Sequence, residues 1–336
     1  MKLCGAARTR EPESIAKSAP LAVVLALLLL LGAAAGCGGD DDDGDQAAGT
    51  LSGRIDLDGS STVEPFATEA AERFLDENPG VAIIVGIFPS RTGGGFKRFC
   101  AGETDLSSAS RPIEDEERNA CRKQGIEYFE LQVANDALTV VVNRENDWAD
   151  CLTINELKKI WEPGSTTDTW SDVRSDFPDE ELELFGPPRD SGTFDYFTEV
   201  ILGEEGASRR DYIASDDDNV TAERVARSSS GLGFFGLSYF SQNQDQLKAL
   251  EIDGGSGCVA PSVETAQNRD YTPLSRPLFI YVRKESLPKP AVRTFVAYVI
   301  ENARSIAESA LFVPLTDEQL EREQRQFDRA AAEARD

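Results

Sequence analysis

Short apolar runs alternate with amphipathic stretches along most of the chain. Residues 81–88 (VAIIVGIF) and 278–284 (LFIYVRK) are apolar runs of strand length, which predicts two buried strands. Before the first run, Phe66, Ala70 and Phe74 recur at helical spacing and predict the apolar side of a helix. Strands that alternate with helices predict an α/β fold whose parallel-rich sheets are covered on both faces.

The same alternation continues in the second half of the chain. Thr153 opens a predicted helix, TINELKKIW, and residues 191–202 (SGTFDYFTEVIL) predict another. Residues 129–143 form a β-rich stretch that is long enough to cross between two lobes. Residues 289–309 predict an amphipathic helix, and the residues from Asp317 onward predict a charged one.

The N-terminal residues are typical of an export signal. A basic leader is followed by an uncharged run, residues 21–36, that is short for a membrane span and ends in small residues. The run stops at AAGC, which resembles a bacterial lipobox whose cysteine, here Cys37, is lipidated. The alternative is an uncleaved signal anchor. We therefore expect a lipoprotein signal peptide over residues 1–36 and an acidic, flexible tether over residues 37–52.

The charge balance is strongly acidic, with 60 Asp and Glu against 34 Lys and Arg and a net charge of −26. Nucleic acids and anionic membrane surfaces are bound by basic patches, so the composition argues against both partners. The chain contains no histidine, which excludes a Ser-His-Asp triad. The length beyond the leader is enough for two domains with cores of their own.

Four cysteines lie beyond Cys37, and in an oxidising compartment they are expected to pair. Three connectivities are available. We favour Cys100 with Cys121, because that loop is short, which leaves Cys151 with Cys258. A zinc site is a poor alternative, since the chain has no CxxC pair and no histidine.

Three clusters of Ser, Thr and Gly follow predicted strands and precede predicted helices: residues 59–62 (GSST), 90–95 (SRTGGG) and 189–193 (RDSGT). Taken singly, each is an ordinary set of cap and turn residues. Together they predict a ligand crevice, because strand-to-helix turns open on one edge of such a sheet. Helix N-termini, hydroxyls and an arginine form a cradle for an anion, even in an acidic protein, because their effect is local.

From Asp56 to about Pro314 the chain resembles the phosphate-binding proteins of bacterial phosphate ABC transporters, in their lipoprotein form. The motifs that carry the resemblance are, in order, DGSSTVEP, TGGGFKRFCAGETDLSSASRPI, LTVVVNRENDW, LTINELKKIWEPG, RDSGTFDYF, SSSGLGFFGLSYF and YTPLSRPLFIYV. The resemblance implies an α/β, two-lobed type II periplasmic-binding-protein fold with a ligand cleft between the lobes. The implied lobes are 53–135 plus 272–336 and 136–271, with crossings near 134–140 and 267–276.

The resemblance also implies ligand contacts from the three clusters and from one further loop. The implied contact residues are Ser61, Thr62, Thr92, Gly93, Ser110, Ser191, Gly192 and Thr193. The chain departs from the family pattern at two positions. Pro187 stands where the binding arginine often stands, which leaves Arg111, Arg189 or both as candidates, with surface ion pairs as the alternative.

The second departure concerns the residue that accepts the proton of phosphate. Ser110 stands at the position of the family's aspartate. Discrimination against sulfate requires an acceptor for that proton, because a fully deprotonated oxyanion cannot satisfy it. The acceptor is then the Ser110 hydroxyl, Asp190 or another acid.

The function that the resemblance implies is capture of inorganic phosphate outside the membrane and its delivery to a permease. The implied partners are the membrane subunits of an ABC transporter and their ATPase, with the lipid anchor as the only attachment to the membrane and no cofactor. The protein is expected not to be an enzyme. The alternatives are a receptor for another tetrahedral oxyanion, such as sulfate or molybdate, and a surface phosphatase or sensor on the same fold.

Overall fold

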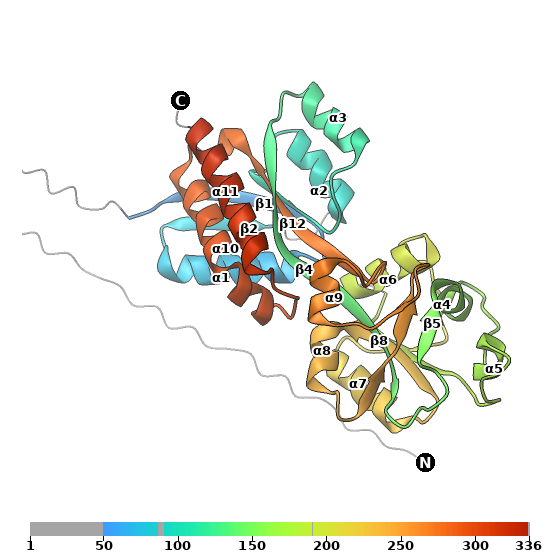
Figure 1. Ribbon diagram of the computed structural model, residues 1–336. Helices are drawn as coiled ribbons and strands as arrows, with labels where there is room; N and C mark the ends of the chain where they lie inside the picture. The colour runs from blue at the N-terminus through green and yellow to red at the C-terminus, as the bar shows by residue number, and fades with distance from the viewer. Residues whose placement is uncertain (1–49, 87–90, 190, 335–336) are drawn as a thin grey trace, which may run out of the picture. The chain divides into compact units, whose positions relative to one another are not determined.

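The computed structural model describes residues 50–86, 91–189 and 191–334. The expected signal peptide, with Cys37 and most of the tether, lies outside these residues. No helix within the described ranges is both long and apolar enough to cross a membrane. The elements up to and including the first strand that links the lobes are β1 (Gly53–Gly59), α1 (Glu64–Glu77), β2 (Val81–Val85), α2 (Arg91–Cys100), β3 (Leu106–Ala109), α3 (Asp115–Lys123) and β4 (Tyr128–Asn143) (Figure 1).

The remaining elements follow as one middle block and a C-terminal return. The middle block holds β5 (Cys151–Thr153), α4 (Ile154–Trp161), α5 (Trp170–Val173), β6 (Glu183–Gly186), α6 (Gly192–Leu202), β7 (Ile213–Ala214), α7 (Asp218–Arg227), β8 (Gly231–Gly236), α8 (Leu237–Gln242), β9 (Leu247–Ala249), β10 (Glu251–Asp253), β11 (Cys258–Val259) and α9 (Val263–Asn268). The return holds β12 (Ser275–Arg283), the 3-10 turn Lys284–Ser286, α10 (Pro290–Ser309) and α11 (Asp317–Glu333).

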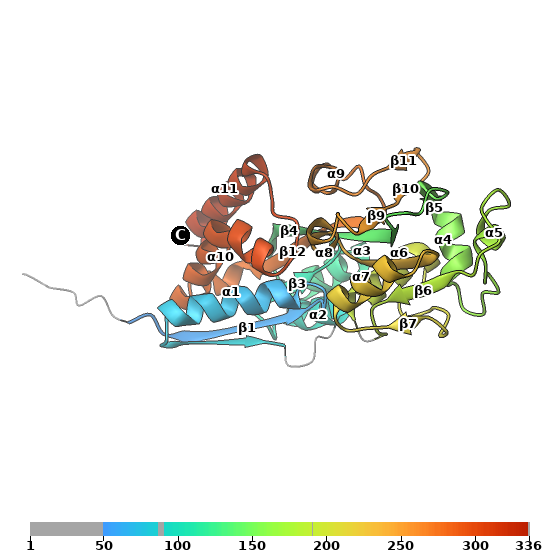
Figure 2. The same cartoon turned by 90° about the horizontal axis from the view of Figure 1, so that it is seen from below.

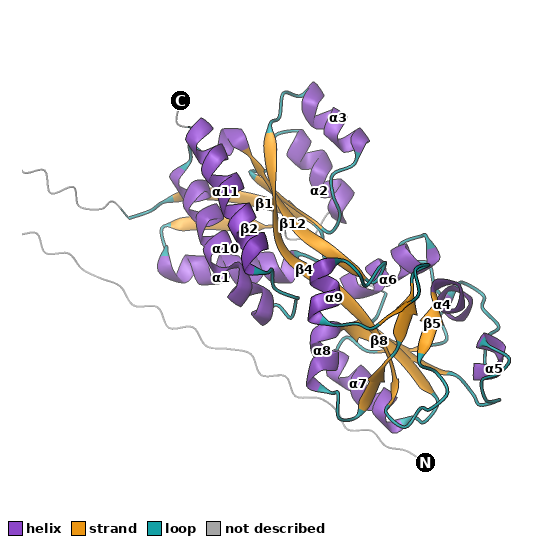
Figure 3. Ribbon diagram, in the orientation of Figure 1, coloured by secondary structure: helices purple, strands orange, loops and turns teal. Residues whose placement is uncertain are grey.

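One large sheet runs through the described residues in the order β2-β1-β3-β12-β4-β8-β6-β7, with β9 paired to β4. Its two outer parts are parallel, as expected from the α/β alternation: β2, β1 and β3 on one side, and β8, β6 and β7 on the other. Its centre differs from that expectation, because β12 and β4 run antiparallel to each other and to their outer neighbours. These two strands link the lobes in opposite directions (Figure 3).

In the first lobe, alternate residues of β12 face two separate apolar layers. Leu278, Ile280 and Val282 pack with α1, α10 and α11, whereas Phe279 and Tyr281 pack with α2 and α3. This is the two-residue period of a strand covered on both faces. Figure 2 shows α1, α10 and α11 on the same side of β1. The helices expected around Phe74 and from Asp317 are confirmed.

The second lobe is built in the same way around the other end of β4. Leu138, Val140 and Val142 join one buried cluster with Trp161, whereas Val141 faces another. Thr153 caps α4, as expected: its hydroxyl accepts the backbone N–H of Glu156. Leu274 packs in this cluster although the expected boundary assigns it to the first lobe, and the lobe limits stay a prediction.

One predicted strand is less buried than its sequence indicates. The run VAIIVGIF predicts a buried strand, but β2 is the edge strand of the sheet, and Ile84 is 39% exposed. An edge strand has a neighbour on one side only, so an apolar run does not guarantee burial there.

Two disulfide bonds brace the lobes, with the pairing favoured from the sequence. Cys100–Cys121 joins α2 to α3 in the first lobe. Cys151–Cys258 joins β5 to β11, the outer strands of a small sheet ordered β11-β10-β5. The first bond therefore fixes the helix that begins at the second Ser/Thr/Gly cluster.

Candidate functional site

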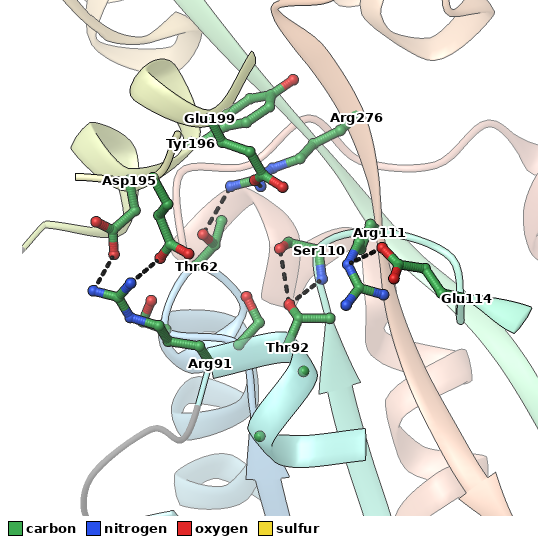
Figure 4. Close-up of a pocket in the computed structure, with 15 residues that line it drawn as sticks. Thr62, Arg91, Thr92, Ser110, Arg111, Glu114, Asp195, Tyr196, Glu199 and Arg276 are labelled. Atoms are coloured by element: carbon green, nitrogen blue, oxygen red, sulfur yellow. Dashed lines mark hydrogen bonds and ion pairs between the residues drawn. The ribbon is translucent and has the colours of Figure 1, made fainter. Parts of the chain in front are cut away.

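A cavity of about 450 Å³ lies between the two lobes (Figure 4). The first lobe contributes the turn after β1, the first turn of α2 and the loop after β3, and the second lobe contributes α6 and the segment after it. Arg276, near the start of β12, completes the lining. The lining residues are Ser60, Ser61, Thr62, Arg91, Thr92, Gly93, Gly94, Ser110, Arg111, Glu114, Asp195, Tyr196, Glu199, Glu205 and Arg276.

The hydroxyl side of the cavity is held together by its own hydrogen bonds. The hydroxyl oxygens of Thr92 and Ser110 lie 3.1 Å apart, and the Ser110 N–H donates to the Thr92 oxygen at 3.3 Å. Thr92 lies in the first turn of α2, where the N–H groups have no partner within the helix. This corner therefore presents both hydroxyls and helix-start N–H groups, which suits an anion.

The glycine run of α2 has a packing reason. A Cβ on Gly95 would lie 2.5 Å from the Cα of Gly59, so the helix can touch the end of β1 only without a side chain there. The close contact places the start of α2 beside the turn after β1. The second and first Ser/Thr/Gly clusters are thereby brought together.

Arg276 is the most buried cation of the lining, with 11% of its side chain exposed. Its Nη2 donates to the Thr62 hydroxyl at 2.8 Å, and its Nε lies 3.4 Å from a carboxylate oxygen of the buried Asp136. Its guanidinium carbon lies 3.4 Å from the ring centre of Tyr196, which is a stacked cation–π contact. These contacts fix the guanidinium while leaving N–H groups for a ligand.

Sequence reasoning missed Arg276. The sequence contained an indication of its role, because Arg276 comes just before an apolar run that predicts a buried strand. A buried arginine needs a charged or polar partner.

The two arginines expected from the sequence have different environments. Arg111 lines the cavity, but its Nη atoms donate to both carboxylate oxygens of Glu117 at 2.8 Å, so acids of its own lobe already hold it. Arg189 is not part of the lining: its Nη2 donates to the carbonyl of Gly206 at 2.5 Å, and it lies over the ring of Phe194.

A further arginine that the sequence analysis did not select, Arg91, reaches across the cavity. It is the first residue of α2, and its Nη atoms lie 2.6 Å from Glu205 and 3.5 Å from Asp195, both in the second lobe. Its φ of 61° is in the left-handed region, which a non-glycine residue adopts at a cost. Burial raises the pKa of Asp195 to about 6, and Glu205 adds to the rise while Arg91 opposes it.

The third Ser/Thr/Gly cluster, residues 189–193, contributes none of its described residues to the cavity lining. Ser191 caps α6, and its hydroxyl accepts the N–H of Thr193 at 3.2 Å, which is the cap role that such clusters ordinarily have. Gly192 nevertheless packs against the turn that carries Thr62, since a Cβ at Gly192 would lie 3.1 Å from the N atom of Thr62. Direct contact of Ser191, Gly192 and Thr193 with a ligand stays a prediction, and Asp190 lies outside the described residues.

The charges of the lining are mixed. Arg91, Arg111 and Arg276 face the carboxylates of Glu114, Asp195, Glu199 and Glu205. Within the part of the chain that the structure describes, no group of three or more His, Cys, Asp or Glu side chains is arranged to hold a metal ion. The site therefore has the means to hold an oxyanion by hydrogen bonds and guanidinium groups, with acids that oppose excess negative charge.

Comparisons with known proteins show the family to which the chain belongs. A family model described as the PBP superfamily domain matches residues 44–303. Protein SphX of Synechocystis sp. is 45% identical over 267 residues, 79% of each chain. The phosphate-binding protein PstS of Staphylococcus saprophyticus is 37% identical over 287 residues, 85% of this chain and 88% of its own.

A solved structure is also similar over most of the chain. It is described as a possible phosphate binding protein from Planctomyces limnophilus and is 44% identical in sequence. The match has a TM-score of 0.80 and covers 83% of this chain and 99% of that one.

Proposed function

Because the chain belongs to the PBP superfamily and has its two-lobed type II periplasmic-binding-protein fold, we propose that it is an extracytoplasmic receptor for inorganic phosphate. It binds phosphate in the cleft between its lobes and delivers it to an ABC permease. The observation that carries the proposal is the convergence of Arg276, Thr92 and the start of α2 on one cavity. Phosphate is proposed as the ligand because the relatives are named for binding it.

The residues have separable tasks in this mechanism. Arg276, fixed by Thr62 and Asp136, offers a guanidinium whose geometry matches two phosphate oxygens. The N–H groups of α2 and the hydroxyls of Thr92 and Ser110 bind the oxygens that face the first lobe. Arg91 closes the cavity from its rim by its ion pairs with the second lobe. Groups that are already in position cost little reorganisation on binding, which favours affinity.

In this proposal phosphate is released from the cleft without chemical conversion. The relatives are named for binding phosphate and not for converting it. The partners are the membrane subunits of an ABC transporter with their ATPase. Attachment is through a lipid on Cys37, which places the protein at the outer face of the cytoplasmic membrane, on the cell surface or the periplasmic side.

Calorimetric titration of residues 50–336 with phosphate, arsenate, sulfate and molybdate tests the proposal. We expect binding of phosphate at one site, with sulfate and molybdate weaker. Preference for sulfate or molybdate would assign the cleft to another oxyanion, and the absence of binding to all four would reject the receptor function.

Thr92→Val is expected to weaken phosphate binding by about 1–3 kcal/mol, because it removes a hydroxyl that lies against a charged ligand. The same variant leaves the Ser110 N–H without its acceptor. The matched control is Thr294→Val, at an exposed position of α10 outside the cavity. Equal affinities of the two variants in calorimetry would remove Thr92 from the site.

Gly192→Ala is expected to weaken phosphate binding by about 1–2 kcal/mol without contacting the ligand. The added methyl group would press on the N atom of Thr62 at 3.1 Å and displace the turn that orients Arg276. Gly236→Ala is the control, since its nearest atom would lie at an ordinary 3.7 Å. An affinity that is unaltered in Gly192→Ala, with its melting temperature also unaltered, would mean that the turn adapts freely.

A further inference from the structure

Glu199 lies in the wall of the cavity, with its carboxylate beside the guanidinium of Arg276. It comes about one helical turn after Tyr196 on α6, so both side chains lie on the helix face that lines the cavity. Figure 4 shows the Glu199 side chain reaching toward Arg276. A carboxylate oxygen of Glu199 lies 4.0 Å from Nη1 of Arg276, which is longer than a hydrogen bond. The two groups therefore attract each other without being locked together.

The other contacts of the Arg276 guanidinium leave its outer edge to a ligand. Its Nε faces the carboxylate of Asp136 at 3.4 Å, one Nη2 hydrogen is donated to the Thr62 hydroxyl, and the ring of Tyr196 covers one face. Nη2 has a second N–H and Nη1 has two. These donors form the edge that binds two oxygens of a phosphate. Glu199 contributes a carboxylate at this same edge.

The charge of Glu199 also acts on a second arginine of the lining. The pKa of Arg111 is raised, chiefly by its hydrogen bond with Glu117, and Glu199 adds to the rise. The Glu199 carboxylate thus lies in the field of two cavity arginines, as an anion bound in the cavity would. Its side chain is 52% exposed, so it can turn toward solvent with little loss of packing.

Only a contact that differs between the empty and the occupied cleft changes the affinity. The carboxylate of Asp136 is buried on the Nε side of Arg276, so that ion pair stays in both states. The Glu199 contact lies at the Nη edge, where a phosphate and a carboxylate repel each other. One of the two anions has to leave this edge, and the half-exposed Glu199 side chain is the one that can.

Resting on the proposed function, we propose that Glu199 is a tethered competitor of phosphate: its carboxylate neutralises the ligand edge of Arg276 in the empty cleft and is displaced when an oxyanion binds. Glu199 thereby lowers the affinity for phosphate and excludes weaker anions. Chloride contacts the edge at one point and does not compensate for the displacement. A phosphate dianion does, because it binds the guanidinium edge and the donors of the first lobe together.

Calorimetric titration with phosphate of the wild-type protein, Glu199→Gln and Glu199→Asp tests the inference. Glu199→Gln removes the charge and should tighten phosphate binding by about 3- to 10-fold. Glu199→Asp keeps the charge but withdraws the carboxylate from Arg276 by one methylene group, so it should tighten binding too. Tighter binding in Glu199→Gln alone would show that only the charge matters and would overturn the inference. Unchanged or weaker binding in Glu199→Gln would overturn it as well.

The response to chloride is a second readout. At constant ionic strength, replacing a bulky sulfonate anion by chloride should weaken phosphate binding to Glu199→Gln, because chloride can then occupy the Nη edge of Arg276. The wild type should respond less, and an equal response would contradict the competitor role.

Glu223→Gln is the matched control, because it removes an exposed acid of α7 that pairs with Arg227 outside the cavity. It should bind phosphate as the wild type does, and tightening equal to that of Glu199→Gln would assign the effect to the net charge of the protein. A wild type that binds no phosphate would reject the proposed function and the inference with it. A wild type that binds phosphate, with variants that fail as described, would reject the inference alone.

Discussion

Arg276→Gln is expected to lower phosphate affinity by about 2–4 kcal/mol, the largest loss for a single side chain of the cleft. Arg276 is the most buried cation of the lining, and its stacking on Tyr196 and its bond to Thr62 hold it in one orientation. Glutamine keeps part of the packing but loses the charge and the paired donors. Calorimetry with phosphate measures the loss.

Two further variants separate binding from stability. Arg276→Gln leaves the buried Asp136 without its cation, so the double variant with Asp136→Asn restores a neutral pair. Arg283→Gln is the matched control: it is another arginine of β12, 14% exposed and also 3.4 Å from a buried acid, Asp105, but it does not line the cavity. Phosphate affinity that falls equally in Arg283→Gln would show that β12, and not the guanidinium, is responsible.

Removing the Cys151–Cys258 disulfide by a double Ser substitution is expected to lower the free energy of unfolding by about 3–5 kcal/mol. The two cysteines are 107 residues apart, so the bond restricts a large part of the unfolded chain. Thermal or chemical denaturation measures the loss, and phosphate affinity should change little because neither cysteine lines the cavity.

The other disulfide provides the comparison. Cys100 and Cys121 are 21 residues apart, so their double Ser variant should lose less, about 3 kcal/mol in the same treatment. Its effect on phosphate binding should be the greater one, since the bond ties α2 to α3. The reverse order of stabilities would mean that native packing, and not chain restriction, dominates.

Local patterns predicted most of the elements. The Thr153 cap, the long strand through residues 129–143 and the charged helix from Asp317 depend on neighbouring residues, and all three are present. The arrangement at the centre of the sheet depends instead on pairing between distant segments. Nothing in the local pattern specifies that β12 lies between β3 and β4 and runs antiparallel to both.

The residues of the candidate site also differ in whether local sequence patterns predicted them. Ser61, Thr62 and Thr92 were expected from cluster motifs, and they line the cavity. Arg276 and Asp195 were not selected, because they meet the clusters only through the tertiary fold; Arg276 and its partner Thr62 are 214 residues apart. The spacing of residues in a sequence indicates which side chains share a face of one helix or strand. It does not indicate which residues from distant segments line the same cavity between lobes.

The place of β12 in the sheet also bears on the order in which the protein acquires its structure during synthesis. The second lobe is formed by one continuous stretch of chain, so it can fold as soon as that stretch is complete. The first lobe lacks the strand between β3 and β4 until β12 has been made, and its α1 layer lacks α10 until later still. The lobe that begins first along the chain is therefore expected to finish last, and β3 lacks its β12 neighbour until the segment between Ala109 and Ser275 has been made.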